Sequence, residues 1–345
     1  MRRALSTPES FGARWGRRAV TIPGYFVLAA LSLALLPLLL PLALVVDLAR
    51  RTPLPLTRTV LLLPWYFTLE AFGLLAAFAL WLVRPLLGPQ RFEHANFRLQ
   101  CLWARSLFAG ACRVLGMRVE LAGEDALGPG SILLFLRHAS VVDTLLPAVL
   151  VSSRTGRRLR YVMKRELLWD PCLDVVGQRL PNAFVRRGTR DAAETELVRE
   201  LAGDLAADED VLLYPEGTRW TPERRRAVIG RLERSADPKL LERAQALEWL
   251  LPPRLGGVLA LLDAAPEADV VIGVHTGFET VRSLADLWNG ALVGRRIQVR
   301  FERIAAAAIP AGREARVDWI YDQWSQLDAW LESHVEPARA PAASR

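Results

Sequence analysis

The sequence predicts an α/β protein, in which a mixed, largely parallel sheet flanked by helices is preceded by an N-terminal membrane hairpin of two apolar helices. Two long apolar runs stand at the front of the 345-residue chain. Behind them, short apolar segments typical of buried strands alternate with amphipathic helical segments, as in α/β domains. We therefore expect a basic segment over 1–21, the hairpin over 22–88, one main domain over 89–335 and a disordered tail over 336–345.

The two apolar runs have the length of membrane segments. Residues 22–46 contain nothing more polar than Tyr25 and Ser32, and a hydrocarbon core is crossed by ~20 helical residues. Residues 59–83 form an equally long run but carry Glu70 near the middle. A signal peptide would be shorter and would lack the second run. A spanning hairpin and a re-entrant one both fit, since prolines interrupt each run.

The distribution of arginine predicts a cytoplasmic N-terminus, with the main domain returned to the same side. The linker between the runs is also basic, which the same rule disfavours outside the cell, and a re-entrant hairpin removes this conflict. The arginines concerned are Arg2, Arg3, Arg14, Arg17 and Arg18 before the hairpin, and Arg50, Arg51 and Arg58 in the linker.

Composition favours a membrane surface over nucleic acid as the partner. The net charge of +7 draws a membrane-anchored protein toward anionic headgroups. The chain has no aromatic-basic reader motif and no helix-turn-helix pattern, so we expect no nucleic-acid partner. Cys101, Cys112 and Cys172 are odd in number and lack metal-ligand spacing. We therefore expect reduced core thiols and no metal site.

The main domain is expected to open with an amphipathic helix over 97–115. Short apolar or alternating segments then predict strands at 119–121, 131–137, 211–214, 269–274 and 297–301. Periodicity and capping residues predict helices at 142–150, from Asp191 with Glu194 as its capping-box partner, and at 313–335. Residues 223–248 form a charged, helix-prone insertion.

The first candidate for chemistry is a histidine–aspartate pair. The strand over 131–137 delivers His138, and Asp143 falls in the first turn of the next helix, which returns its carboxylate toward the imidazole. Such a carboxylate fixes the tautomer of the ring and stabilises its protonated form. The ring then serves as a general base toward an alcohol. A lone histidine is more often structural, so the pair gains weight from the motifs that follow it.

Three further motifs together suit a phosphate site, although each alone fits an ordinary turn or linker. Arg187 and Arg219 offer planar, permanently charged forks for phosphate oxygens. Gly217 permits close approach of the backbone to a ligand. Glu216 is placed to accept a hydrogen bond from a substrate hydroxyl or to orient an arginine. The motifs are Phe184-Val185-Arg186-Arg187, Pro215-Glu216-Gly217-Thr218-Arg219 and Pro253-Arg254 with Gly256-Gly257.

In this order and spacing, over roughly 131–276, the blocks resemble those of the glycerolipid (lysophospholipid) acyltransferases. Lys164–Leu167 matches the family's basic-Glu-Leu segment, and the Pro253-Arg254 block is similar to the branch with lysophosphatidate and lysocardiolipin-type enzymes. The fourth block departs from the pattern, because His275 stands where the family has proline. We expect a packed structural histidine there, with a ligand or a second base as alternatives.

The resemblance implies transfer of a fatty acyl group from acyl-CoA or acyl carrier protein to the hydroxyl of a lysophospholipid, first of all lysophosphatidate. It implies no metal and no bound cofactor, membrane phospholipids as partners, and a membrane location with the acyltransferase domain facing the cytoplasm. By position, the catalytic residues are His138 and Asp143, the substrate-binding residues Arg187, Glu216, Gly217, Thr218 and Arg219, and further candidates Phe184, Arg186, Pro253 and Arg254.

Two functions of other kinds remain open. A thioesterase or lipid hydrolase would use the same pair on water, but the chain lacks a convincing Gly-x-Ser-x-Gly nucleophile motif. A membrane lipid-binding protein without activity would not need an intact set of His138, Asp143, Glu216 and Arg219. Within the enzyme class, a lyso-ornithine lipid or a sugar lipid is an alternative acceptor.

Overall fold

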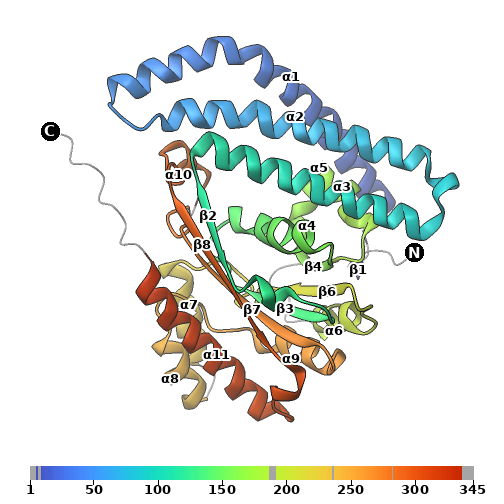
Figure 1. Ribbon diagram of the computed structural model, residues 1–345, viewed down its shortest axis with the longest axis vertical. Coiled ribbons are helices and arrows are strands. Elements are labelled where there is room, and N and C mark those ends of the chain that lie inside the picture. The colour runs from blue at the N-terminus through green and yellow to red at the C-terminus, as the bar shows by residue number, and fades with distance from the viewer. Residues whose placement is uncertain (1–4, 7–8, 186–191, 235–236, 282, 336–345) are drawn as a thin grey trace.

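The structure, a computed structural model, describes residues 5–6, 9–185, 192–234, 237–281 and 283–335. Three long N-terminal helices form a layer over an α/β domain, whose sheet carries helices on both faces (Figure 1). This arrangement confirms the predicted fold class. The predicted tail, 336–345, lies outside the described residues.

One mixed sheet forms the centre of the domain, with strand order β1-β5-β4-β6-β3-β7-β8-β2. All neighbours are parallel except β7 and β8, which are antiparallel. Every residue of β3 is buried, which explains its unbroken apolar sequence. The strands are β1 (Leu5–Ser6), β2 (Arg118–Ala122), β3 (Ile132–Leu136), β4 (Arg158–Lys164), β5 (Ala183–Val185), β6 (Glu209–Leu213), β7 (Asp269–Thr276) and β8 (Arg296–Ile304).

Helices supply the outer layers of the fold, three long ones at the front and shorter ones in the domain. They are α1 (Phe11–Ala49), α2 (Pro55–Leu82), α3 (Arg84–Leu115), α4 (Ser153–Thr155), α5 (Pro171–Val175), α6 (Ala192–Ala202), α7 (Pro222–Leu232), α8 (Pro238–Ala246), α9 (Leu255–Ala264), α10 (Leu284–Trp288) and α11 (Arg313–His334).

Three predicted helices differ in their limits or type. α1 begins upstream of the apolar run, and α3 begins well before residue 97, with a break at Gly88 (φ 70°, ψ 170°). The helix predicted over 142–150 is instead a 3₁₀ turn, Val142–Leu145, followed by a π-helical turn, Pro147–Ser152. Proline cannot donate the backbone hydrogen bond of a regular α-helix, so the change of type falls where it stands.

Strand β4 was missed by the sequence analysis because it contains a buried arginine. Arg160 is 2% exposed and donates to the Leu201 carbonyl oxygen at 2.7 Å and to Asp204 Oδ1 at 2.9 Å. It also pairs with Glu209 at the start of β6. These partners compensate the buried charge, but the arginine breaks the apolar pattern that marks a strand. β5, with three residues, was too short to recognise.

The sheet separates two apolar cores, because successive side chains of a strand point to opposite faces. Ile132, Leu134 and Leu136 face one core, which also contains Ala104 and Phe108 of α3. The opposite core receives the alternate residues of the same strand. It comprises Leu133, Phe135, Leu261 of α9 and Trp324 of α11, with their neighbours.

The α1–α2 hairpin lies along the domain rather than standing away from it (Figure 1). Near the hairpin turn, Arg58 donates to the Val114 carbonyl oxygen at 2.6 Å, and Thr59 Oγ1 to the Leu287 carbonyl oxygen at 3.2 Å. Near the start of α1, Arg18 Nε donates to Asp174 Oδ2 of α5 at 2.9 Å. Both ends of the hairpin are therefore fixed to the domain.

α1 and α2 are long and apolar enough to cross a membrane by length and composition. Of the two helices, α1 is the more exposed, because 11% of its most apolar stretch is buried, against 33% of that of α2. Glu70 of α2 is fully buried beside Cys172, whose thiol donates to the Glu70 carbonyl oxygen at 3.4 Å. The acidic residue in the second apolar run is thus enclosed by protein.

Gly110 allows α2 and α3 to approach closely, which generates a stability prediction. A methyl group at Gly110 would lie 2.0 Å from Trp65 Nε1 on α2, whereas one at Gly230 of α7 would be no closer than 3.8 Å to any atom. We expect Gly110→Ala to lower the free energy of unfolding by about 1–3 kcal/mol through overpacking. Gly230→Ala should leave it unchanged or raise it, because alanine favours helix by about 1 kcal/mol. Thermal melts measure both variants, and an equal change in their melting temperatures would contradict this packing.

Candidate active site

The site lies at the carboxyl ends of three adjacent parallel strands. β3 delivers His138, β6 leads into Tyr214 and Glu216, and β7 contains His275 near its end. Because β6, β3 and β7 are neighbours, residues that follow them meet at one edge of the sheet, where open α/β folds bind their ligands.

His138 and Asp143 form the hydrogen-bonded pair that their spacing predicts. His138 Nδ1 lies 2.9 Å from Asp143 Oδ1. The other carboxylate oxygen, Oδ2, accepts the backbone N–H groups of Ala139 at 2.7 Å and Ser140 at 2.8 Å. The loop between the two residues therefore folds back over the carboxylate and holds it against the ring.

Asp143 remains ionised although it is fully buried. Burial opposes the charge, but the charge of His138 and hydrogen bonds from His138 and His275 outweigh it and hold the pKa of Asp143 well below its ordinary value. An ionised carboxylate at Nδ1 requires the hydrogen of the His138 ring on that nitrogen. Nε2 is then the basic atom, on a side chain that is 11% exposed.

Glu216 ties the loops around this pair together. Its Oε1 accepts the backbone N–H of His138 at 2.8 Å, and its Oε2 accepts that of Leu251 at 2.9 Å. The residue is 2% exposed. Both oxygens of Glu216 thus bind the backbone and brace the site, and its predicted contact with the substrate stays a prediction.

The loop after β6 brings two of the predicted motifs into contact. Gly217 adopts a left-handed conformation (φ 63°), and a Cβ there would lie 2.5 Å from Arg254 Cδ. The backbone N–H of Arg254 also donates to the Pro215 carbonyl oxygen at 2.7 Å. Only glycine accepts this conformation and this neighbour together without strain. Within this contact, Pro253 is buried and Arg254 is exposed.

Arg224, which the sequence analysis did not single out, lies beside Arg219. Its Nη1 donates to the Arg219 carbonyl oxygen at 3.1 Å. Burial and the positive charge of Arg219 lower the pKa of Arg224, against the opposing charge of Glu223. In the sequence, Arg224 belongs to an Arg-Arg-Arg run that is typical of an exposed helix face.

Of the remaining predicted site residues, the structure describes Thr218 and Phe184. Thr218 is partly buried, directly after Gly217. Phe184 is fully buried in β5, where its ring would lie 3.3 Å from a Cβ at Gly177, so the structure assigns it to packing. Arg186 and Arg187 lie outside the described residues, and their predicted role stays a prediction.

Two aromatic rings next to the pair were not predicted as neighbours of the site. The Tyr214 ring lies 4.6 Å from the His138 ring, centroid to centroid, at 37°. His275 is fully buried, with Nε2 3.4 Å from Asp143 Oδ2. Arg137 closes this side of the site, since it donates to Glu279 Oε1 at 2.6 Å and to the His275 carbonyl oxygen at 2.5 Å.

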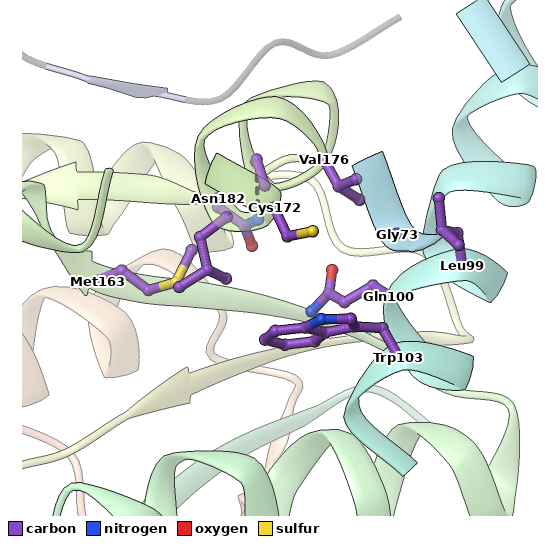
Figure 2. A pocket seen from close by; sticks show the side chains of 10 residues that line it. Gly73, Leu99, Gln100, Trp103, Met163, Cys172, Val176 and Asn182 are labelled. Carbon is purple, nitrogen blue, oxygen red and sulfur yellow. Dashed lines mark hydrogen bonds between the residues drawn. The ribbon is translucent and has the colours of Figure 1, made fainter. Parts of the chain in front are cut away.

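An apolar cavity lies between α2, α3, α5 and β4 (Figure 2). Burial raises the pKa of the Cys172 thiol in its wall, so this sulfur is a neutral, free thiol, as predicted. No group of three or more potential metal ligands occurs among the described residues. The cavity is lined by Gly73, Leu99, Gln100, Trp103, Met163, Cys172, Leu173, Val176, Gly177 and Asn182.

Three comparisons show which known proteins this chain resembles. A family model described as Acyltransferase matches residues 118–256. Lysocardiolipin acyltransferase 1 of Danio rerio is 23% identical over 257 residues, which are 73% of this chain and 64% of that protein. The chain therefore spans about two thirds of the length of this curated relative.

A solved structure has the same fold. It is the 1-acyl-sn-glycerophosphate (LPA) acyltransferase PlsC from Thermotoga maritima, with a TM-score of 0.52 and 13% sequence identity. The match covers 81% of this chain and 98% of that one. At this identity the likeness concerns the fold.

The buried carboxyl of Glu216 predicts a pH-dependent contribution to stability. Burial raises its pKa to about 8, against hydrogen bonds from the backbone N–H groups of His138 and Leu251, from an ordinary value of 4.5. The folded protein thus keeps a proton that the unfolded chain releases. This stabilisation is complete below the lower value and is lost as pH rises through the upper one.

We therefore expect Glu216→Gln to flatten the fall in the free energy of unfolding between pH 5 and about pH 8, even though it weakens the fold at pH 5 by losing one acceptor. Denaturant melts at several pH values measure this slope. Glu332→Gln, at an exposed position of α11, is the matched control and should keep the wild-type slope. Equal slopes for all three proteins would show that Glu216 does not titrate in this range.

Proposed function

Because a family model described as Acyltransferase matches residues 118–256, we propose that this protein transfers a fatty acyl group from acyl-CoA or acyl carrier protein to the hydroxyl of a lysophospholipid, with lysophosphatidate as the acceptor. The observation that carries the proposal is the buried Asp143 carboxylate bonded to the His138 ring at the carboxyl edge of the sheet. This pair provides a base of defined tautomer where a ligand binds.

In this mechanism, His138 Nε2 takes the proton of the acceptor hydroxyl while the oxygen attacks the thioester carbonyl. Asp143 stabilises the imidazolium that forms. The C–S bond then breaks, the acyl–oxygen ester remains, and the imidazolium returns its proton to the leaving thiolate. Glu216 keeps the His138 backbone in place throughout.

Arginines beside the pair suit a phosphorylated acceptor. Arg219 and Arg224 lie together after β6, and two guanidinium groups match the charge and planar geometry of phosphate oxygens. By its motif, Arg187 is a further candidate for binding the phosphate. A phosphate bound by these arginines would favour lysophosphatidate over a neutral monoacylglycerol.

The hairpin suits binding to one face of a membrane. α2 is fixed to the domain by Arg58 in its first turn and by Tyr66 near its middle, while α1 presents large exposed apolar side chains. We infer that the α1 face enters the lipid with the hairpin lying along the surface, which keeps the basic linker on the same side as the domain. The positive-inside tendency makes that side the cytoplasm.

An acceptor panel tests the proposed function. Protein in lipid vesicles is supplied with acyl-CoA or acyl carrier protein thioester and with lysophosphatidate, other lysophospholipids or monoacylglycerol, and products are identified by mass spectrometry. We expect phosphatidate from lysophosphatidate, and a loss of at least ~10²–10⁴-fold in His138→Ala, the range of general-base contributions. His334→Ala, at an exposed histidine of α11, should keep wild-type turnover.

Arg219→Lys refines the same assay. Lysine keeps the charge and loses the fork, so the KM for lysophosphatidate should rise about ten- to a hundredfold, the worth of one charged hydrogen bond. The KM for the thioester should stay unchanged. Thioester loss that is independent of any acceptor would identify a hydrolase instead, and wild-type turnover in His138→Ala would exclude the mechanism.

A further inference from the structure

His275 on β7 contacts the catalytic carboxylate from the side opposite to His138. The residue is fully buried, and its Nε2 lies 3.2 Å from the Arg137 carbonyl oxygen and 3.4 Å from Asp143 Oδ2. The proposed mechanism assigns it no step. In the acyltransferase pattern described above, a proline stands here, whose side chain has no donor.

The surroundings of the ring determine its tautomer. Both groups near Nε2 are acceptors, so this nitrogen carries the hydrogen. Nδ1 is buried without a hydrogen-bond partner among the described residues. A hydrogen on Nδ1 would be a buried donor left unsatisfied, which is costly. The hydrogen on His275 Nε2 therefore lies between the Arg137 carbonyl oxygen at 3.2 Å and Asp143 Oδ2 at 3.4 Å.

With His275, four N–H groups surround the carboxylate of Asp143. The His138 ring N–H lies at Oδ1, the backbone N–H groups of Ala139 and Ser140 donate to Oδ2, and His275 Nε2 lies 3.4 Å from the same Oδ2. Each added donor draws negative charge from the carboxylate and weakens its attraction for the hydrogen that it shares with His138.

We propose that His275 is a positioning residue of the acyl-transfer reaction, acting through Asp143 to limit the basicity of the His138 ring. The inference rests on the proposed function. A ring held by a buried carboxylate is stabilised as imidazolium, and an imidazolium cannot accept the proton of the acceptor.

The other charged and titratable groups around the pair are accounted for by contacts of their own. Glu216 bonds to the backbone of His138, and the Tyr214 ring packs on the His138 ring. Arg137 is neutralised by Glu279 on the far side of His275. His275 is thus the side chain that adds a donor to Asp143 beyond its predicted partner.

The test compares His275→Phe, which keeps an aromatic ring against Phe278 but removes the donor, with His275→Gln, which retains an N–H donor. The readouts are the acid limb of the kcat/KM profile and the protonation of the His138 ring, followed by NMR of protein with ¹⁵N-labelled histidine. The chain has four histidines, so single variants assign each signal. His275→Met replaces the Phe variant if that protein does not fold.

We expect the Phe variant to raise both midpoints by roughly half to one pH unit. One pH unit corresponds to 1.36 kcal/mol and one charged hydrogen bond is worth about 1.5–3 kcal/mol, so the expected shift is a fraction of one such bond. The Gln variant should stay at the wild-type midpoints. Unchanged or lowered midpoints in the Phe variant would overturn the inference. Absence of transfer by the wild-type protein would instead refute the proposed function, and the NMR titration would still decide the role of His275.

Discussion

The fold around the site depends on one buried charge. Asp143 is fully enclosed, and a buried carboxylate is tolerated only when hydrogen bonds replace its water. The chain after β3 meets this demand by turning two backbone N–H groups and the His138 ring onto it. The loop conformation, the ring tautomer and the position of the basic nitrogen all follow from that requirement.

Further buried polar groups extend the same constraint to neighbouring strands. Glu216 joins the end of β3 to the segment around Leu251, and Arg137 joins it to the end of β7 through the His275 carbonyl oxygen. These groups are satisfied mainly by backbone atoms, so they fix loops rather than pairs of side chains. The strand ends are thereby held rigid before any substrate arrives, which is what a preorganised site requires.

The sequence analysis succeeded for strands that are buried and whose sequence is correspondingly apolar. β3, β6 and β7 are apolar runs, and the spacing of His138 and Asp143 predicted their contact. It failed where polar side chains are buried by partners distant in sequence. Arg160 interrupts the apolar pattern of β4, yet it is buried because it pairs with Glu209. His275 lies near Asp143 only because β7 is the neighbour of β3 in the sheet. Arg224 was unrecognisable for a similar reason, since a run of three arginines on a helix ordinarily faces solvent.

The most direct test of this account is Asp143→Asn, because asparagine keeps the shape of the side chain and removes its charge. The backbone N–H groups of Ala139 and Ser140 would hold the amide oxygen, so the amide N–H₂ would face the His138 ring and reverse its tautomer. We predict a fall in kcat of about 10⁴ in the vesicle assay, with the melting temperature changed little. A variant that retains kcat within about tenfold of wild type, less than the ~10²-fold minimum for a general base, would contradict the central role of the carboxylate.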